Sequence, residues 1–266
     1  MKKMKSRQCT WTQTKLDYVL DTFETITLKE MDNVKLMDRV ETKYVMNYTQ
    51  LIEVLQKLVP HYKILMVENI KKNKYQTHYF DTPDFKMYKK HHNGIVNRYK
   101  IRTREYVDTG LLFTEVKFKN NKKKTIKKRI KTKNKTALNQ DSQEFVENKS
   151  SFNGNELRFA LENTYSRLTF VHKQNRERLT IDLDLEYRNN KNETLTLEGI
   201  VVAEVKQEKL SHKSDFKNIM HEMHIRSRGF SKYCMGVSFL YSNAVKNNNF
   251  KENKLFLKKI SKGERA

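Results

Sequence analysis

Charged residues occupy every second position in several segments of this chain, with apolar residues between them. Arg39, Glu41 and Lys43 follow this spacing, and Glu115 and Lys117 repeat it. Side chains of a β-strand point alternately to opposite faces, so each segment predicts a strand with one apolar face and one charged face. A protein that catalyses phosphoryl transfer needs cations held in fixed positions around the phosphate. The pattern therefore predicts a site for a phosphate-rich anion and its metal ion on a sheet that gathers cations.

The same alternation recurs along most of the chain. It places further charged residues on the same face of their strands, namely Arg98, Lys100, Arg102, Arg104, Lys127, Arg129, Arg178, Asp182, Asp184, Glu204 and Lys206. For any one such strand, a solvated outer face is the more common explanation. Like charges on neighbouring strands destabilise a sheet, however, so their repetition from residue 39 to residue 206 favours an anion that neutralises them.

The chain contains no motif of a conventional kinase or hydrolase. It has no P-loop, no glycine-rich nucleotide motif and no nucleophile triad. The eight histidines show no metal-binding spacing; His221 and His224 lie three positions apart, which is more typical of a helix surface. Cys9 and Cys234 form no metal or redox motif, as expected in a reducing cytosol. The alternating charges remain the main indication of function.

The composition favours one domain that binds a polyanion. A formal net charge of +23 over 266 residues points to nucleic acid, an acidic membrane or a phosphate-rich ligand. Lysine-rich runs such as residues 131–135 are typical of solvated loops, so the net charge carries less weight than the alternation. Only 2 Pro and 7 Gly occur, so no linker divides the chain, and no stretch reaches the roughly 20 apolar residues of a membrane span. We expect a single domain over residues 1–266 in the cytoplasm.

Turn residues and apolar periodicity predict the secondary structure. Strands are expected at residues 38–46, 62–67, 75–80, 97–106, 111–119, 125–131, 165–172, 179–187, 195–197 and 201–207. Helices are expected after a cap at Asn47 or Thr49, after the turn at residues 81–84, and at residues 215–224 and 232–243. Residues 132–164 are expected to be polar and then helical, and residues beyond 245 to fray. Together these elements predict an α+β fold with a closed antiparallel β-barrel and peripheral helices.

Eight short stretches resemble a known family in sequence and in order. They are Glu41–Tyr44, Tyr79–Asp81, Lys100–Tyr106, Thr114–Lys117, Lys127–Arg129, Tyr165–Phe170, Ala203–Lys206 and Phe230–Val237. The chain resembles the VTC domain of polyphosphate polymerases, the catalytic domain of the vacuolar transporter chaperone complex, within the triphosphate tunnel metalloenzyme superfamily. The resemblance covers a core of about residues 36–245, which leaves an N-terminal extension (1–35) and a basic tail (246–266).

The resemblance implies an eight-stranded tunnel that binds triphosphate and a divalent metal. The residues that match its phosphate-binding basic positions, and would carry catalysis, are Lys43, Arg102, Arg104, Lys117, Lys127, Arg167 and Lys232. Tyr165 and Ser231 match residues beside a tunnel arginine and a tunnel lysine. Further phosphate-binding candidates are Arg98, Lys100, Arg129, Arg178 and Lys206.

The resemblance also implies Glu204 as the ligand of Mn²⁺ or Mg²⁺, hard cations that carboxylates suit. Glu115 and Glu41 are the next candidates, although each fits an ion pair with the lysine two residues further on equally well. Asp182 and Asp184 fit arginine neutralisation as well as metal binding. The wider superfamily often opens its first strand with Glu-x-Glu-x-Lys, and Arg39 stands here at the first of those positions. This departure argues against a two-metal triphosphatase.

The predicted function is a free-standing polyphosphate polymerase, which moves the γ-phosphate of ATP onto a growing polyphosphate chain and releases ADP. One alternative is a tripolyphosphatase or nucleoside triphosphatase of the same fold. Another is a non-catalytic binder of polyanions or nucleic acid, which is disfavoured because the charged face is expected to carry few aromatic residues for base stacking. The predicted partners are ATP and polyphosphate, with no specific nucleic acid, and a membrane protein could hold the enzyme at the inner face of a membrane.

Overall fold

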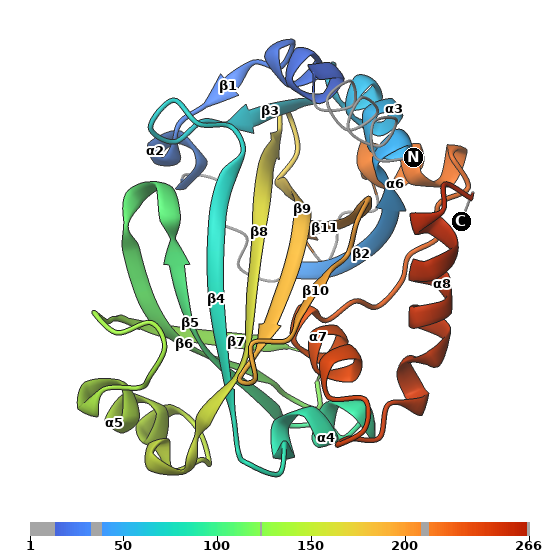
Figure 1. Cartoon of the computed structure of the whole chain (residues 1–266). Helices are drawn as coiled ribbons and strands as arrows, with labels where there is room; N and C mark the ends of the chain where they lie inside the picture. The colour runs from blue at the N-terminus through green and yellow to red at the C-terminus, as the bar shows by residue number, and fades with distance from the viewer. Residues whose placement is uncertain (1–13, 33–38, 123, 209–212, 265–266) are drawn as a thin grey trace.

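The computed structural model describes residues 14–32, 39–122, 124–208 and 213–264. A strongly curved antiparallel sheet of long strands forms its centre, with helices around it (Figure 1). In spatial order these strands are β2 (Arg39–Asn47), β11 (Ile200–Glu208), β9 (Glu177–Asn189), β8 (Arg158–His172), β4 (Asn73–Asp81), β5 (Arg98–Tyr106), β6 (Leu111–Lys119) and β7 (Thr125–Lys131). Three short strands extend the sheet, namely β1 (Thr25–Ile26), β3 (Tyr62–Leu65) and β10 (Thr194–Thr196).

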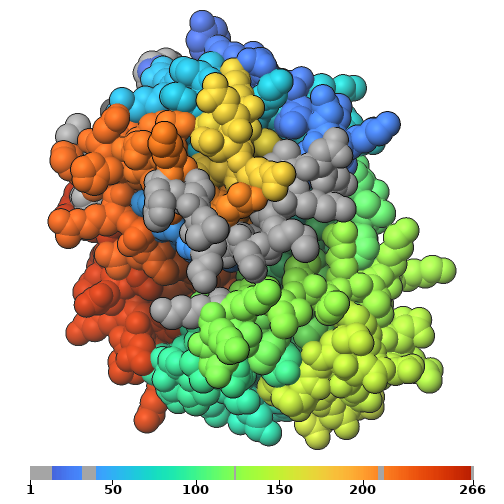
Figure 2. Space-filling view, turned by 180° about the vertical axis from the view of Figure 1, so that it is seen from behind, coloured from blue at the N-terminus to red at the C-terminus, as the bar shows by residue number. Residues whose placement is uncertain are grey.

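The α+β class and the antiparallel pairing of the long strands are as predicted, but the prediction of a closed barrel is wrong. Among the described residues, β2 pairs only with β11 and β7 only with β6, so the sheet remains open between its end strands. Seen from behind, the green surface of β6 and β7 and the orange surface around α6 (Asp215–Glu222) lie on opposite sides (Figure 2). Lys127, Lys128, Arg129 and Lys131 line β7, and such charges oppose pairing with another basic strand.

Helices cover the convex outer face of the sheet in two places. Residues 14–21, α3 (Tyr48–Leu58) and α6 pack on β2, β11, β9 and β8 through one apolar cluster that includes Leu55 and Phe216. The α5 helix (Gln140–Lys149) covers β5 and β6 through a second cluster. The predicted cap at Asn47 is confirmed, because its side chain accepts the Gln50 backbone N–H at 2.9 Å. These clusters leave the other face of the sheet for the charged side chains.

One half of the concave inner face is apolar and is filled by a helix. The α7 helix (Lys232–Leu240) packs there against β8 and β9, and α4 (Lys86–His92) and α8 (Lys251–Ser261) lie beside it (Figure 1). A Cβ at Gly236 would lie 2.5 Å from Leu161 and 2.6 Å from Tyr187, so only glycine allows this approach. The α7 helix therefore limits the charged site to the other half of the inner face.

Three stretches differ from the predicted secondary structure. The β8 strand begins at Arg158 and not at residue 165, since pairing with β4 extends it through a segment that looks helical. The tail forms α8, where Leu257 and Ile260 are buried although lysines dominate the composition. In the N-terminal extension the structure places a helix at residues 14–21 and α2 (Leu28–Asp32), neither of which was predicted. In all three stretches, contacts with distant parts of the chain determine the secondary structure.

Candidate functional site

Glu204 lies at the centre of a first cluster of charges on β2 and β11. The register sets it opposite Lys43 and sets Lys206 opposite Glu41. Glu204 Oε2 lies 2.9 Å from Lys43 Nζ, and Oε1 lies 2.7 Å from Lys206 Nζ. Burial would raise the pKa of Glu204, but the attraction of the two lysines outweighs it and holds this pKa well below its usual range. Glu204 is therefore a carboxylate at neutral pH.

Glu115 forms the second cluster, on β6. One carboxylate oxygen lies 2.6 Å from an Arg102 guanidinium nitrogen and 2.8 Å from its Nε, and the other lies 2.5 Å from Lys127 Nζ. Burial opposes ionisation here as well, yet the charge of Arg102 lowers the pKa of Glu115 and keeps it ionised. These contacts favour ion pairing over metal binding for Glu115.

Asp182 forms the third cluster and joins the sheet to α7. Arg167 binds it through two nitrogens, at 2.6 Å and 2.8 Å, and Lys232 from the first turn of α7 also contacts it. Such a bidentate arginine–carboxylate pair is strong and directional. Asp182 therefore acts as the neutralising residue that the charge pattern allowed.

The start of α7 carries further contacts to the basic residues. Lys100 donates to Ser231 Oγ at 2.8 Å, and Lys43 donates to the Phe230 carbonyl at 3.2 Å. Ser231 also accepts the Cys234 backbone N–H and so caps the helix. The matched residues Ser231 and Lys232 are thus brought next to the cations of β2 and β5.

Lysines outnumber the carboxylates that could neutralise them, and Lys117 shows this most clearly. No carboxylate oxygen lies within 4 Å of its ammonium in the part of the chain that the structure describes. Burial lowers the pKa of Lys117 to about 7 and those of Lys100, Lys127 and Lys232 to about 8. For Lys43 burial has the same tendency, but Glu204 outweighs it and raises the pKa. An anion bound between these lysines would restore their charge.

Several predicted residues lie at the margins of this arrangement. Arg98 donates to the Ile95 carbonyl at 3.1 Å, and Arg178 contacts the Met31 carbonyl at 3.4 Å. On β2, Arg39 pairs in register with Glu208 of β11. Arg98 and Arg178 thus lie beyond the three carboxylate clusters.

Asp184 does not share the face of Asp182, contrary to the predicted alternation. Its φ of +55° marks a bulge in β9, where the register with β8 shifts. The bulge turns its carboxylate to the outside, where it accepts the Tyr48 hydroxyl at 2.6 Å. One irregular residue thus reverses the strand's parity and sends Leu185 and Tyr187 to the inner face.

The inner face also carries aromatic and hydroxyl side chains that sequence reasoning missed. Tyr79 lies 3.5 Å from Arg102, and Thr77 accepts a hydrogen bond from Arg104 Nε at 3.3 Å. Tyr75 stacks on Tyr165 with ring centroids 5.2 Å apart. The expectation of few aromatics on the charged face is therefore wrong. The available signal was the spacing of residues 75, 77 and 79, which matches that of the charged strands.

A cluster on the outer face of the sheet has residue types that could bind a metal, but a proton occupies one of the nitrogens that would have to be a ligand. Ligand atoms of His61, His172 and Asp215 lie within 4.8 Å of one another. His172 Nδ1 accepts the backbone N–H groups of Gln174 at 3.0 Å and Asn175 at 2.9 Å. Its proton must therefore reside on Nε2, 2.7 Å from Asp215 Oδ2, where it blocks a metal. The cluster is a hydrogen-bonded support between β8 and α6.

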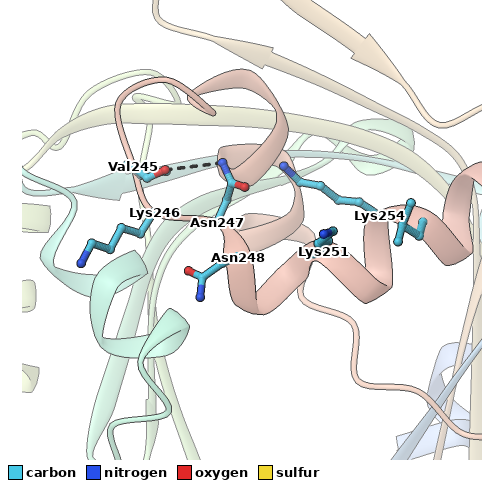
Figure 3. Close-up of a pocket in the computed structure, with 7 residues that line it drawn as sticks. Val245, Lys246, Asn247, Asn248, Lys251 and Lys254 are labelled. Carbon is cyan, nitrogen blue, oxygen red and sulfur yellow. Dashed lines mark hydrogen bonds between the residues drawn. The ribbon is translucent and has the colours of Figure 1, made fainter.

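A basic pocket of about 610 Å³ lies away from the inner face, at the start of α8 (Figure 3). Lys246, Lys251 and Lys254 are among its lining residues. Lys254 donates to the Ser238 carbonyl at 2.6 Å and so supports the end of α7. The residues that line this pocket include no Asp or Glu, and none of them belongs to the three carboxylate clusters.

The carboxylates of the first cluster fit a hard divalent cation, for which oxygen ligands are required. Glu204 is ionised and its side chain is 18 % exposed. Glu41 lies on the adjacent strand β2, two residues before Lys43, which is the residue opposite Glu204. Both oxygens of Glu204 contact lysines, so a cation would bind there only together with phosphates that draw these lysines away. Glu115, at 1 % exposed, lacks such access.

The chain matches one protein family over most of its length and is more weakly similar to several solved structures. Residues 38–241 match the VTC domain. A structure of a putative adenylate cyclase from Bacillus halodurans is 16% identical with a TM-score of 0.48, over 73% of this chain and 96% of that chain. A putative adenylyl cyclase from Hippeastrum, described as having a dominant triphosphatase activity, is 13% identical with a TM-score of 0.45, over 76% and 96%. No curated protein sequence matched the chain.

The family match covers most of the chain and includes the strands of all three clusters. Among the described residues, no helix has the length and apolar character to cross a membrane. On the strength of the match over residues 38–241, this chain belongs to the VTC domain family.

Proposed function

We propose that this protein is a polyphosphate polymerase. It would transfer the γ-phosphate of ATP to the end of an inorganic polyphosphate chain and release ADP. The observation that carries the proposal is the convergence of Lys43, Arg102, Lys117, Arg167 and Lys232 around three carboxylates on one face of the sheet. The family resemblance supports the choice of reaction.

The chemistry needs positioning and charge stabilisation more than covalent work by the protein. A terminal oxygen of the polyphosphate attacks the γ-phosphorus, and the bond from that phosphorus to the β–γ bridging oxygen breaks, so ADP leaves with the electron pair. Arg102 and Arg167 present planar guanidinium groups that suit phosphate oxygens, and their carboxylate partners hold them in place. Lys117 contacts no carboxylate among the described residues, so it is suited to bind the transferred group.

A divalent cation, Mn²⁺ or Mg²⁺, would neutralise phosphate oxygens when bound. Glu204 would hold it, with Glu41 as the second candidate and Glu115 kept for ion pairing. Arg39 in place of a further first-strand carboxylate supports the polymerase over a two-metal triphosphatase. A single domain, a cytoplasmic location and a membrane-protein partner stay predictions.

The test is to incubate purified protein with ATP and Mn²⁺ and to analyse both products. We expect ADP together with an acid-labile polymer that is resolved on a gel. A Lys117→Met variant, whose unbranched side chain is one atom shorter and uncharged, serves as the matched inactive control. ADP with orthophosphate alone would support the triphosphatase, and ATP binding without turnover would support a non-catalytic binder.

A further inference from the structure

A row of four aromatic rings crosses the inner face, although phosphate binding does not require aromatic rings. It consists of Tyr165, Tyr75, Tyr106 and Phe113, on the neighbouring strands β8, β4, β5 and β6. Ring centroids of Tyr75 and Tyr106 lie 5.1 Å apart, and those of Tyr106 and Phe113 lie 6.0 Å apart with their planes at 86°. We call this set the aromatic row.

The two halves of the aromatic row have different surroundings. Tyr165, which is buried, lies under Lys232 at 4.5 Å and under Arg167 at 5.3 Å. Arg167 also lies 5.2 Å from the ring of Tyr75. Such cation–π contacts explain the inner half as a support for the phosphate-binding cations. They do not explain the outer half of the row, which is only partly buried.

Phe113, at the outer end of the aromatic row, is covered by the side chain of Arg129. The guanidinium of Arg129 lies 4.4 Å from its ring centroid. Arg129 is exposed, and no carboxylate lies within 4 Å of it among the residues that the structure describes. A guanidinium is flat and polar, so its position shows that this face of Phe113 accepts a planar, polar group at stacking distance.

The strand directions place this ring at a suitable distance from the phosphate-binding cations. Phe113 lies two residues before Glu115 on β6, about 7 Å along the strand. It also pairs in register with Arg104 on β5. The phosphates of a nucleotide with its base on Phe113 would thus be within reach of Arg102 and Lys127, the cations that contact Glu115.

We propose that Phe113, supported by Tyr106, stacks on the nucleobase of ATP. The base takes the place of the Arg129 guanidinium, which then pairs with a phosphate. This inference rests on the proposed function in one respect, namely that a nucleoside triphosphate is the phosphate donor. It gives the site a means to distinguish the nucleotide donor from inorganic polyphosphate, because both offer phosphates and only one carries a base.

The test compares ATP with inorganic tripolyphosphate by titration calorimetry in EDTA, where no turnover occurs. Phe113→Leu keeps an apolar side chain but removes the aromatic face. We expect it to weaken ATP binding about tenfold, the scale of one base–aromatic stack, and to change tripolyphosphate binding less than twofold. The matched control is Phe118→Leu, on the same strand but on the outer face, where Phe118 stacks on Tyr99 at 4.6 Å. It should leave both affinities within twofold.

An equal loss for both ligands, or no loss for ATP, would overturn the proposal. A second measurement needs no variant: the adenine H2 and H8 resonances of ATP should move upfield on binding to the unaltered protein, and unshifted resonances would overturn it too. Tight binding of a single-stranded oligonucleotide without a triphosphate would instead indicate a nucleic-acid platform. Base-selective ATP binding without polymer would reject the polymerase and keep the stacking site, whereas polymer synthesis with unselective binding would reject the stacking site alone.

Discussion

Glu115 and Glu204 are each neutralised by two cations on the inner face, yet their surroundings differ. Glu115 is almost completely buried and holds Arg102 through two guanidinium nitrogens, with Lys127 on its other oxygen. Glu204 is partly exposed and contacts two lysines, which are compact and flexible cations. The comparison indicates that Glu115 organises the site, while the contacts of Glu204 can be exchanged for a metal ion and phosphates.

The largest effect is expected for Glu204→Gln, which keeps the shape but removes the charge that a divalent cation needs. We expect polymerase activity to fall at least ~10²-fold, as on loss of one strong transition-state interaction. Tripolyphosphate binding in EDTA should persist, because the lysines remain. Glu41→Gln is the matched comparison and should cost less. An active Glu204→Gln beside an inactive Glu41→Gln would reverse the assignment.

Glu115→Gln should act mainly on stability. It leaves the buried charge of Arg102 without its partner, and breaking such a pair costs about 3 kcal/mol of unfolding free energy. Chemical denaturation measures this loss, and added tripolyphosphate should reduce it by supplying negative charge. Glu105→Gln, which breaks the more exposed pair with Lys135 at 3.2 Å, is the control and should cost under about 1 kcal/mol. Equal losses in both variants would contradict a special role for Glu115.

Tripolyphosphate binding should be accompanied by proton uptake at pH 8. Burial lowers the pKa of Lys117 to about 7 and that of Lys127 to about 8 in the free protein, and a bound anion must raise both. The complex then holds more protons than the free protein, so affinity should fall about tenfold or more from pH 7 to pH 9. Calorimetry in buffers of different ionisation enthalpy measures the protons directly. Binding that is independent of pH and buffer would show that these lysines are already fully charged.

The smallest effect is expected at the pocket of Figure 3, where Lys251 is exposed. Salt and water screen such a surface charge, so Lys251→Gln should change tripolyphosphate affinity less than twofold at physiological ionic strength. A loss as large as that of Lys117→Met would mean that total charge, and not placement on the inner face, determines binding.

The sequence by itself determined which residues share a face of each regular strand. The direction of a strand side chain is a local property with period two, so the alternation around Lys43, Arg102, Lys117 and Glu204 could be interpreted without knowing any neighbouring strand. The same holds for the Asn47 cap, whose hydrogen bond spans three residues. These local rules account for the α+β class and for the basic residues that meet on the inner face.

Only the tertiary structure decided how these faces are arranged. The open edges of β2 and β7, the packing of α7 in half of the inner face and the bulge at Asp184 depend on contacts between distant parts of the chain. The different surroundings of Glu115 and Glu204 have the same origin. Burial and ion pairing depend on which strands and helices become neighbours, and a pattern with period two contains no information about that choice.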